Sequence, residues 1–237
     1  MEIDKLPLVN ISDNDSVKYA KPFLPDNPVI IEAGACDAED TKIFKKTWPD
    51  CTVYCFEPNP DLFKKASIAI AGLSNVEIEE CALADYCGMK TFYMSEFEAT
   101  SSFYPDNSKN VDVPKSILDS MNLKDKSELR SYSEKPIPVK CKTIDSFVNA
   151  KGILRVDYLW LDVEGAELNV LRGAINTLKT VKVLSVEWGL QEFRKGVVLF
   201  DDLYQFIISQ NFEIKYIWKA HENWMGNAIF INNGNIK

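Results

Sequence analysis

An apolar run that ends in an acidic residue and a glycine constrains the fold of this chain more than any other stretch. Residues 29–31 are Val-Ile-Ile, and Glu32, Ala33 and Gly34 follow. This pattern predicts a buried strand of a parallel sheet, then a tight turn and the start of a helix. Ligands of open α/β sheets bind at the carboxyl ends of such strands, and Gly34 has no Cβ to keep a ligand away from the backbone. We therefore expect a nucleotide-like ligand at this turn.

Strand and helix patterns alternate along most of the chain. Strands are predicted at 29–32, 52–56, 76–80, 137–141, 156–161 and 181–186, and helices at 38–47, 61–71, 166–178 and 198–209. Another helix is expected to begin after Thr143, and residues 90–94 are expected to form a hairpin partner of the strand before them. Two strands, near 212–218 and 228–232, close the chain. The alternation predicts an α/β fold with a doubly wound, mostly parallel sheet and a C-terminal antiparallel hairpin.

The organisation expected is a polar lead-in over residues 1–27 and a single domain over 28–237. Between residues 100 and 136 the periodicity stops, and a stretch of this length inside a domain indicates a lid or a substrate-side insertion. The first 15 residues lack the apolar region of a signal peptide, and no stretch approaches the roughly 20 apolar residues of a membrane span.

Charge and cysteine use narrow the class of protein. The formal net charge of −8 argues against general nucleic-acid binding, which needs a basic surface. The six cysteines form no CxxC pair, which indicates reduced thiols and a cytoplasmic location. The single histidine, His221, argues against a zinc site. The oligomeric state is left open.

Acidic residues recur where strands are predicted to end. The carboxyl ends of parallel strands share one edge, so these side chains are expected to converge there. The residues concerned are Glu32, Glu57, Asp85, Asp162 and Glu187. Glu57 ends the second strand, where a carboxylate accepts hydrogen bonds from both ribose hydroxyls of an adenosine ligand.

The first turn is not a GxGxxG loop, because Ala35, Cys36, Asp37 and Ala38 follow Gly34. The missing glycines weaken a cradle for a diphosphate, and Asp37 adds negative charge where a diphosphate would bind. A ligand with a cationic centre suits this turn better. S-adenosylmethionine has a sulfonium, an ammonium and a ribose, whereas a nicotinamide-dependent oxidoreductase remains the alternative on the same fold.

Several segments, in this order, resemble the FkbM-type S-adenosylmethionine-dependent methyltransferases. They are Ile30–Ala35, Phe56–Asn59, Thr143–Asp145, Leu159–Glu167 and Leu171–Ala174. The Asp-Val-Glu-Gly-Ala-Glu block that begins at Asp162 is the most specific of them. The family usually has glycine where Ala38 stands, so Ala38 is a departure. The resemblance implies a Rossmann-like fold of the class I methyltransferase type and O-methylation of a hydroxyl, often on a sugar or a natural-product scaffold.

The residues expected to bind S-adenosylmethionine lie at the first strand ends and in the loops after them. They are Glu32, Gly34, Ala35, Asp37, Thr41, Glu57, Pro58, Asn59, Ala82, Leu83 and Asp162. Glu32 and Asp37 are expected at the cationic end of the ligand, and Glu57 at its ribose.

A sugar hydroxyl is a poor acid, so its methylation calls for a base or a metal. Asp162 is the first candidate for the base, Glu164 and Glu187 follow, and His221 is a further one. Asp162 and Glu187 would also supply the oxygen ligands that magnesium prefers. The acceptor itself is not identified, and a non-catalytic methyltransferase-like module that docks a partner is the other alternative.

Overall fold

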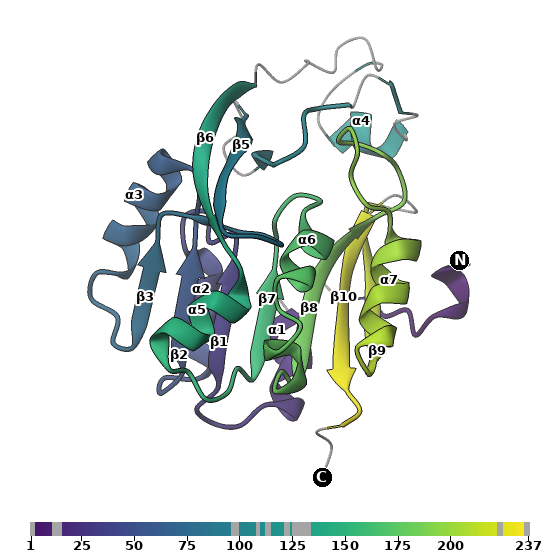
Figure 1. Ribbon diagram of the computed structural model, residues 1–237. Helices are drawn as coiled ribbons and strands as arrows, with labels where there is room; N and C mark the ends of the chain where they lie inside the picture. Colours follow the sequence, from purple (N-terminus) through teal and green to yellow (C-terminus); the bar gives the residue numbers. More distant parts are fainter. Residues whose placement is uncertain are drawn as a thin grey trace.

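The computed structural model describes residues 3–10, 16–95, 100–107, 110–111, 115–120, 124, 134–221 and 225–234. A seven-stranded sheet in the order β3-β2-β1-β7-β8-β10-β9 forms its centre (Figure 1). Its strands are β1 (Val29–Ala33), β2 (Thr52–Phe56), β3 (Val76–Glu79), β7 (Tyr158–Leu161), β8 (Val183–Gly189), β9 (Phe212–His221) and β10 (Met225–Asn232). The first five are mutually parallel, and β10 runs antiparallel to both β8 and β9. The predicted fold class, with its C-terminal hairpin, is confirmed.

Helices cover both faces of this sheet, as Figure 1 shows. They are α1 (Ser16–Ala20), α2 (Glu39–Thr47), α3 (Pro60–Ile70), α5 (Ile144–Lys151), α6 (Glu167–Arg172) and α7 (Phe200–Ser209). Apolar residues of α5, α6 and α7 pack in one core with β1, β7 and β8. Those of α1 and α2 pack in a second core on the other face. Apolar side chains on both faces explain why the central strands read as continuous apolar runs.

The helices begin where local sequence stabilises their first turn. The Asn59 side chain accepts hydrogen bonds from the amides of Asp61 and Leu62, and Pro60 fills the first position of α3. Thr143 caps α5 as predicted, because its side chain accepts from the amide of Ser146. These caps fix how the chain turns from a strand end into the following helix.

A second, three-stranded sheet was not predicted. It consists of β4 (Ala82–Leu83), β5 (Gly88–Met94) and β6 (Lys135–Lys142), in the order β4-β6-β5. The prediction that residues 90–94 pair with the strand before them is therefore wrong, because β5 pairs antiparallel with β6. This sheet stands above the carboxyl edge of the main sheet, beside the short helix α4 (Lys115–Ser120) (Figure 1).

The described residues cover the expected lid, residues 100–136, only in part, and its role stays a prediction. Of its described part, Ser102 pairs with Tyr93 of β5, and Asp106 pairs with Arg194. No helix in the described part of the chain is long and apolar enough to cross a membrane.

Candidate active site

The register of the paired strands places four of the predicted site residues in one row across the sheet. Ala33 of β1 pairs with Phe56 of β2 and with Leu161 of β7, and Leu161 pairs with Val186 of β8. The residues that follow this row are Gly34, Glu57, Asp162 and Glu187. Gly34, Glu57 and Asp162 therefore leave the sheet side by side at its carboxyl edge, and Glu187 lies beside them within β8, which continues to Gly189. Asp85 does not join them, because it follows β4 of the second sheet.

The turn after β1 is tight, with left-handed backbone at Gly34 (φ 86°), Cys36 (φ 48°) and Ala38 (φ 66°). A Cβ on Gly34 would lie 1.8 Å from the carbonyl oxygen of Asp162. Gly34 is thus required by the neighbouring strand end, which is a different reason from the ligand approach that we expected. Ala38 adopts a conformation that glycine adopts more easily, which accounts for the glycine usual there.

Glu57 is held by the backbone on both sides of its strand end. Its Oε2 accepts from the amide of Cys36 at 2.9 Å, and its Oε1 accepts from the amide of Asn59 at 2.7 Å. Burial raises the pKa of Glu57 to about 7, although these two hydrogen bonds favour the charged form. The carboxylate is therefore fixed in place, and each oxygen retains a lone pair for a further donor.

The loop after β7 is equally constrained. Glu164 (φ 53°) and Gly165 (φ 94°) are both left-handed. Oε1 of the buried Glu167 accepts from the amides of Val163 and Gly165. The hydroxyl of the buried Ser102 donates to the carbonyl of Glu164 at 2.7 Å. Ser102 is thus a structural anchor that joins residues 100–107 to this loop.

A main cavity of about 330 Å³ lies at this edge, between the turns after β1, β2 and β7. Six acidic residues line it: Asp37, Asp40, Glu57, Asp162, Glu164 and Glu187. Of the predicted cofactor-binding residues, those that line it are Gly34, Asp37, Glu57, Pro58, Ala82, Leu83 and Asp162. Sequence reasoning missed Asp40, although its place in the first turn of α2 was a usable signal.

Four predicted cofactor-binding residues lie behind the wall of this cavity instead: Glu32, Ala35, Thr41 and Asn59. Glu32 has no exposed surface, and its Oε2 accepts a hydrogen bond from the Thr41 hydroxyl. Burial raises its pKa to about 8. Glu32 is therefore neutral near pH 7 and reaches a ligand only through neighbouring residues. Asn59 shapes the site through its hydrogen bond to Glu57.

Three of the predicted catalytic residues come together. Asp162, Glu164 and Glu187 each place a carboxylate oxygen within 4.8 Å of the other two. Burial raises the pKa of Glu164 to about 7, while Arg194 opposes that rise. His221 ends β9, and its side chain lies outside the described residues.

A family model of the methyltransferase FkbM domain matches residues 32–214, which is most of the chain. The chain belongs to the FkbM methyltransferase family. The resemblance seen in the sequence motifs is thereby confirmed, and the acidic edge described above is the edge of a methyltransferase.

Characterised relatives are methyltransferases as well. The chain is 28% identical over 173 residues to the 2-O-methyltransferase NoeI of Sinorhizobium fredii, covering 73% of this chain and 67% of NoeI. It is 30% identical over 157 residues to Methyltransferase 1 of Beauveria bassiana, covering 64% of this chain and 60% of that protein. The chain thus spans about two thirds or less of these relatives.

Solved structures share the fold of this FkbM methyltransferase. An rRNA methylase from Streptococcus thermophilus superposes with a TM-score of 0.51 at 12% identity, covering 94% of this chain and 99% of that one. A protein of the NADB-Rossmann superfamily from Streptococcus agalactiae gives a TM-score of 0.50 at 14% identity, covering 97% and 72%. At such identities the likeness concerns the Rossmann-like fold alone.

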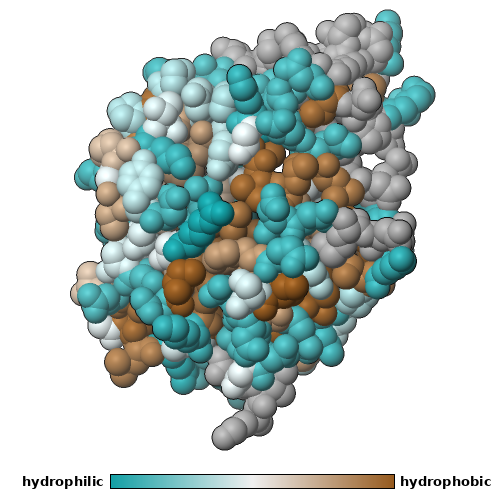
Figure 2. All heavy atoms as spheres, turned by 45° about the vertical axis from the view of Figure 1, so that its right-hand side comes forward, coloured by the Kyte–Doolittle hydropathy of each residue, from teal (hydrophilic) through white to brown (hydrophobic). Residues whose placement is uncertain are grey.

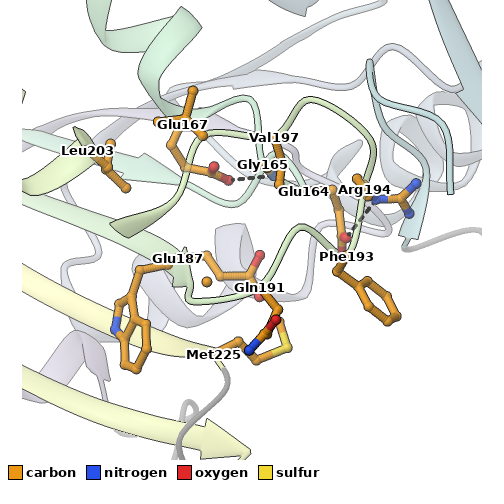
Figure 3. Close-up of a pocket in the computed structure, with 13 residues that line it drawn as sticks. Glu164, Gly165, Glu167, Glu187, Gln191, Phe193, Arg194, Val197, Leu203 and Met225 are labelled. Atoms are coloured by element: carbon orange, nitrogen blue, oxygen red, sulfur yellow. Dashed lines mark hydrogen bonds and ion pairs between the residues drawn. The ribbon is translucent and has the colours of Figure 1, made fainter. Parts of the chain in front are cut away.

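The residue of this FkbM methyltransferase that sequence reasoning missed most clearly is Arg194. Its side chain is 3% exposed, and its Nε lies 3.6 Å from Oε2 of Glu164, a pair drawn in Figure 3. Its Nη1 lies 3.1 Å from Oε1 of Glu134 and donates to the carbonyl of Tyr104. These partners are remote in sequence, so no local pattern could have indicated the role of Arg194.

Proposed function

We propose that this methyltransferase transfers a methyl group from S-adenosylmethionine to a hydroxyl of a saccharide or glycan. The observation that carries the donor assignment is the charge of the main cavity. Six carboxylates line it, and no lysine, arginine or histidine does so among the described residues. A sulfonium and an ammonium are attracted to such a site, whereas the diphosphate of a nicotinamide cofactor is repelled.

Glu57 suits the ribose of this donor. Its two main-chain hydrogen bonds fix the carboxylate at the end of β2, and both oxygens can accept one hydroxyl each. Asp37 and Asp40 line the same cavity from the turn after β1 and the first turn of α2. Their charge suits the cationic end of the donor.

S-adenosylmethionine supplies an electrophilic methyl group, and the protein must aim the acceptor oxygen at it and remove the hydroxyl proton. We assign that proton removal to the cluster of Asp162, Glu164 and Glu187, whose carboxylates lie together at the edge of the main cavity. Glu164 is held in an ion pair with Arg194, which orients its carboxylate toward that guanidinium. Asp162 and Glu187 are therefore the first candidates.

The choice of oxygen as the methylated atom has separate support. NoeI, which aligns with most of this chain, is named for 2-O-methyl transfer, and the sequence motifs resemble a family that often methylates sugars. Neither point identifies the acceptor of this chain, because a shared fold does not fix a substrate.

The same three carboxylates also suit a hard divalent cation such as Mg²⁺, which would acidify an acceptor hydroxyl bound to it. Removal of divalent ions with excess EDTA separates the two mechanisms. An unchanged methylation rate assigns proton removal to the carboxylates alone. A loss of rate that added Mg²⁺ restores assigns a role to the ion.

Calorimetry with S-adenosylhomocysteine tests the donor site. We expect the wild-type protein to bind it, and Glu57→Ala to weaken binding by about 10-fold or more, because two charge-assisted hydrogen bonds are lost. The matched control is Asp61→Ala, an exposed carboxylate at the start of α3 that does not line the main cavity. No binding by the wild-type protein, or thermal stabilisation by NAD⁺ instead, would refute the proposal.

The base is tested by isosteric variants. Asp162→Asn and Glu187→Gln are each expected to retain S-adenosylhomocysteine binding. The variant that lacks the base is expected to lose about 10²–10⁴-fold in turnover, as is typical of general-base removal. Turnover is measured as the gain of one CH₂ in the acceptor by mass spectrometry. Near-normal turnover in both variants would move the role to Glu164 or His221.

A further inference from the structure

A second, smaller cavity shares lining residues with the main cavity, and Figure 3 shows the residues that line this second cavity. It measures about 70 Å³, and we call it the side cavity. Glu164 and Glu187 line both cavities. The two cavities therefore meet at these two residues. This is the arrangement that a transfer between two bound molecules requires.

The walls of the side cavity are mainly apolar. Trp188, Phe193, Leu203 and Met225 contribute to them from β8, the following loop, α7 and β10. Gln191 adds an amide at the solvent side, and in Figure 3 it lies next to Glu187. On the face turned forward in Figure 2, hydrophobic atoms are likewise exposed among hydrophilic ones. Apolar walls with a few polar groups are typical of small-molecule sites.

The charge of the side cavity selects against anions. Three carboxylates line it, those of Glu164, Glu167 and Glu187. Arg194 is the basic residue that lines it among the described residues, and its guanidinium faces Glu134 and Glu164. A phosphate or carboxylate on a ligand would therefore meet Glu187 and, as Glu164 and Glu167 ionise with pKa values of about 7, further like charge. Hydroxyls can donate to Glu187 and Gln191.

We infer that the side cavity binds the methyl acceptor, and that this acceptor is a neutral, hydroxyl-bearing ring with an apolar face, such as a sugar without a carboxylate or phosphate. The apolar walls contact the C–H face of the ring, and Glu187 and Gln191 bind its hydroxyls. The small volume holds the end of the acceptor that carries the reacting oxygen, and the remainder extends into solvent. This inference rests on the proposed function, since it assigns the second substrate of the same site.

The experiment compares a cavity-filling variant with a neighbour that leaves the cavity open. Gln191→Trp places a large ring at the entrance of the side cavity. Lys195→Trp, on the same loop, adds the same ring at an exposed position that does not line it. The probes are methyl glycosides of neutral hexoses and the corresponding methyl uronosides, which differ by one carboxylate. Methyl incorporation is measured by mass spectrometry, and donor binding by calorimetry with S-adenosylhomocysteine.

We expect methylation of at least one neutral glycoside, with kcat/KM for its uronoside about 10²-fold lower because of like-charge contact. Gln191→Trp is expected to lower kcat/KM by about 10²-fold, as misplacement of an acceptor does, while the affinity for S-adenosylhomocysteine stays within about twofold. Lys195→Trp should retain both the wild-type kcat/KM and the wild-type affinity for S-adenosylhomocysteine.

Equal methylation of neutral and anionic probes would overturn the charge selection. Normal kcat/KM in Gln191→Trp would overturn the assignment of the cavity. Neither result would contradict the proposed methyl transfer from S-adenosylmethionine to a hydroxyl. A wild-type protein that binds S-adenosylhomocysteine but methylates no neutral glycoside refutes the acceptor class in both proposals, and absence of that binding refutes the donor.

Discussion

Glu57 shows how one buried carboxyl connects ligand binding to pH. Burial raises its pKa to about 7, so about half of the protein carries it protonated near neutral pH. A protonated carboxyl can accept fewer hydrogen bonds from the two ribose hydroxyls than a carboxylate can. Donor binding should therefore favour the ionised form.

We predict that the affinity for S-adenosylhomocysteine rises by about tenfold between about pH 6 and about pH 8, because ionisation of Glu57 is linked to binding. Calorimetry across this range measures the effect. Glu57→Gln should bind more weakly at high pH and show a flat profile, whereas Asp61→Asn should retain the wild-type slope. A steep profile in Glu57→Gln would assign the linkage to another group.

At the residue scale, the sequence predicted where the site residues lie more accurately than it predicted which contacts require them there. Glu57, Asp162 and Glu187 could be placed at the carboxyl edge of the sheet, because the end of an apolar run in the sequence marks the end of each parallel strand. Gly34 was correctly singled out, but the atom that excludes a Cβ there is the carbonyl oxygen of Asp162, which is remote in sequence. Glu32 was expected at the ligand, yet its side chain points into a closed interior that no local pattern reveals.

At the scale of elements, one buried guanidinium joins three separate segments. Arg194 follows β8, Glu134 immediately precedes β6, and Glu164 lies in the loop after β7. Val197 extends the same contact, because a Cβ on Gly165 would lie 2.2 Å from its Cγ2. The loop after β8 is therefore fastened to the wall of the site at two points.

We predict that Arg194→Met costs about 3 kcal/mol of unfolding free energy, because loss of one partner leaves Glu134 and Glu164 without their cation. Urea unfolding measures it. Lys195→Met removes the same charge from an exposed neighbour and should change stability by no more than about 0.5 kcal/mol. Equal changes in unfolding free energy in the two variants would show that the buried contacts of Arg194 do not contribute to stability.

Element boundaries were predictable where the signal was local. The limits of β2 and the cap of α5 agree with the structure. The helix expected over 166–178 ends at Arg172 instead, and Gly173 follows at a close approach to the chain, where a Cβ would lie 2.1 Å from the carbonyl oxygen of Ala84. The second sheet was missed for a similar reason, since β5 and β6 are joined by a long segment without periodicity.

Across the part of the molecule that the structure describes, four carboxyl groups have pKa values raised mainly by burial. They are Glu32, to about 8, and Glu57, Glu164 and Glu167, each to about 7. In the unfolded chain these groups ionise near their ordinary value of 4.5. Because the folded state holds their protons longer, their contribution to stability is present at low pH and is lost as pH rises through about 7 to 8.

We predict that stability of the ligand-free protein falls between about pH 5 and about pH 8, and that Glu32→Gln removes part of this fall, on the order of a few kcal/mol. Glutamine resembles the protonated acid, so the variant should match the wild type at low pH and exceed it at high pH. Chemical unfolding at several pH values measures the difference. A parallel pH dependence in both proteins would contradict the role of Glu32.

The row shared by β1, β2, β7 and β8 has a consequence for how this enzyme could be altered. Strand pairing sets the positions of Glu57 and Asp162, which we propose for donor recognition, and their side chains supply the selectivity. The side cavity that we propose for the acceptor takes part of its lining from residues 189–198, the connection between β8 and α7. That connection is an exchangeable module: grafting it from a family member of different selectivity should transfer acceptor choice while leaving donor recognition intact.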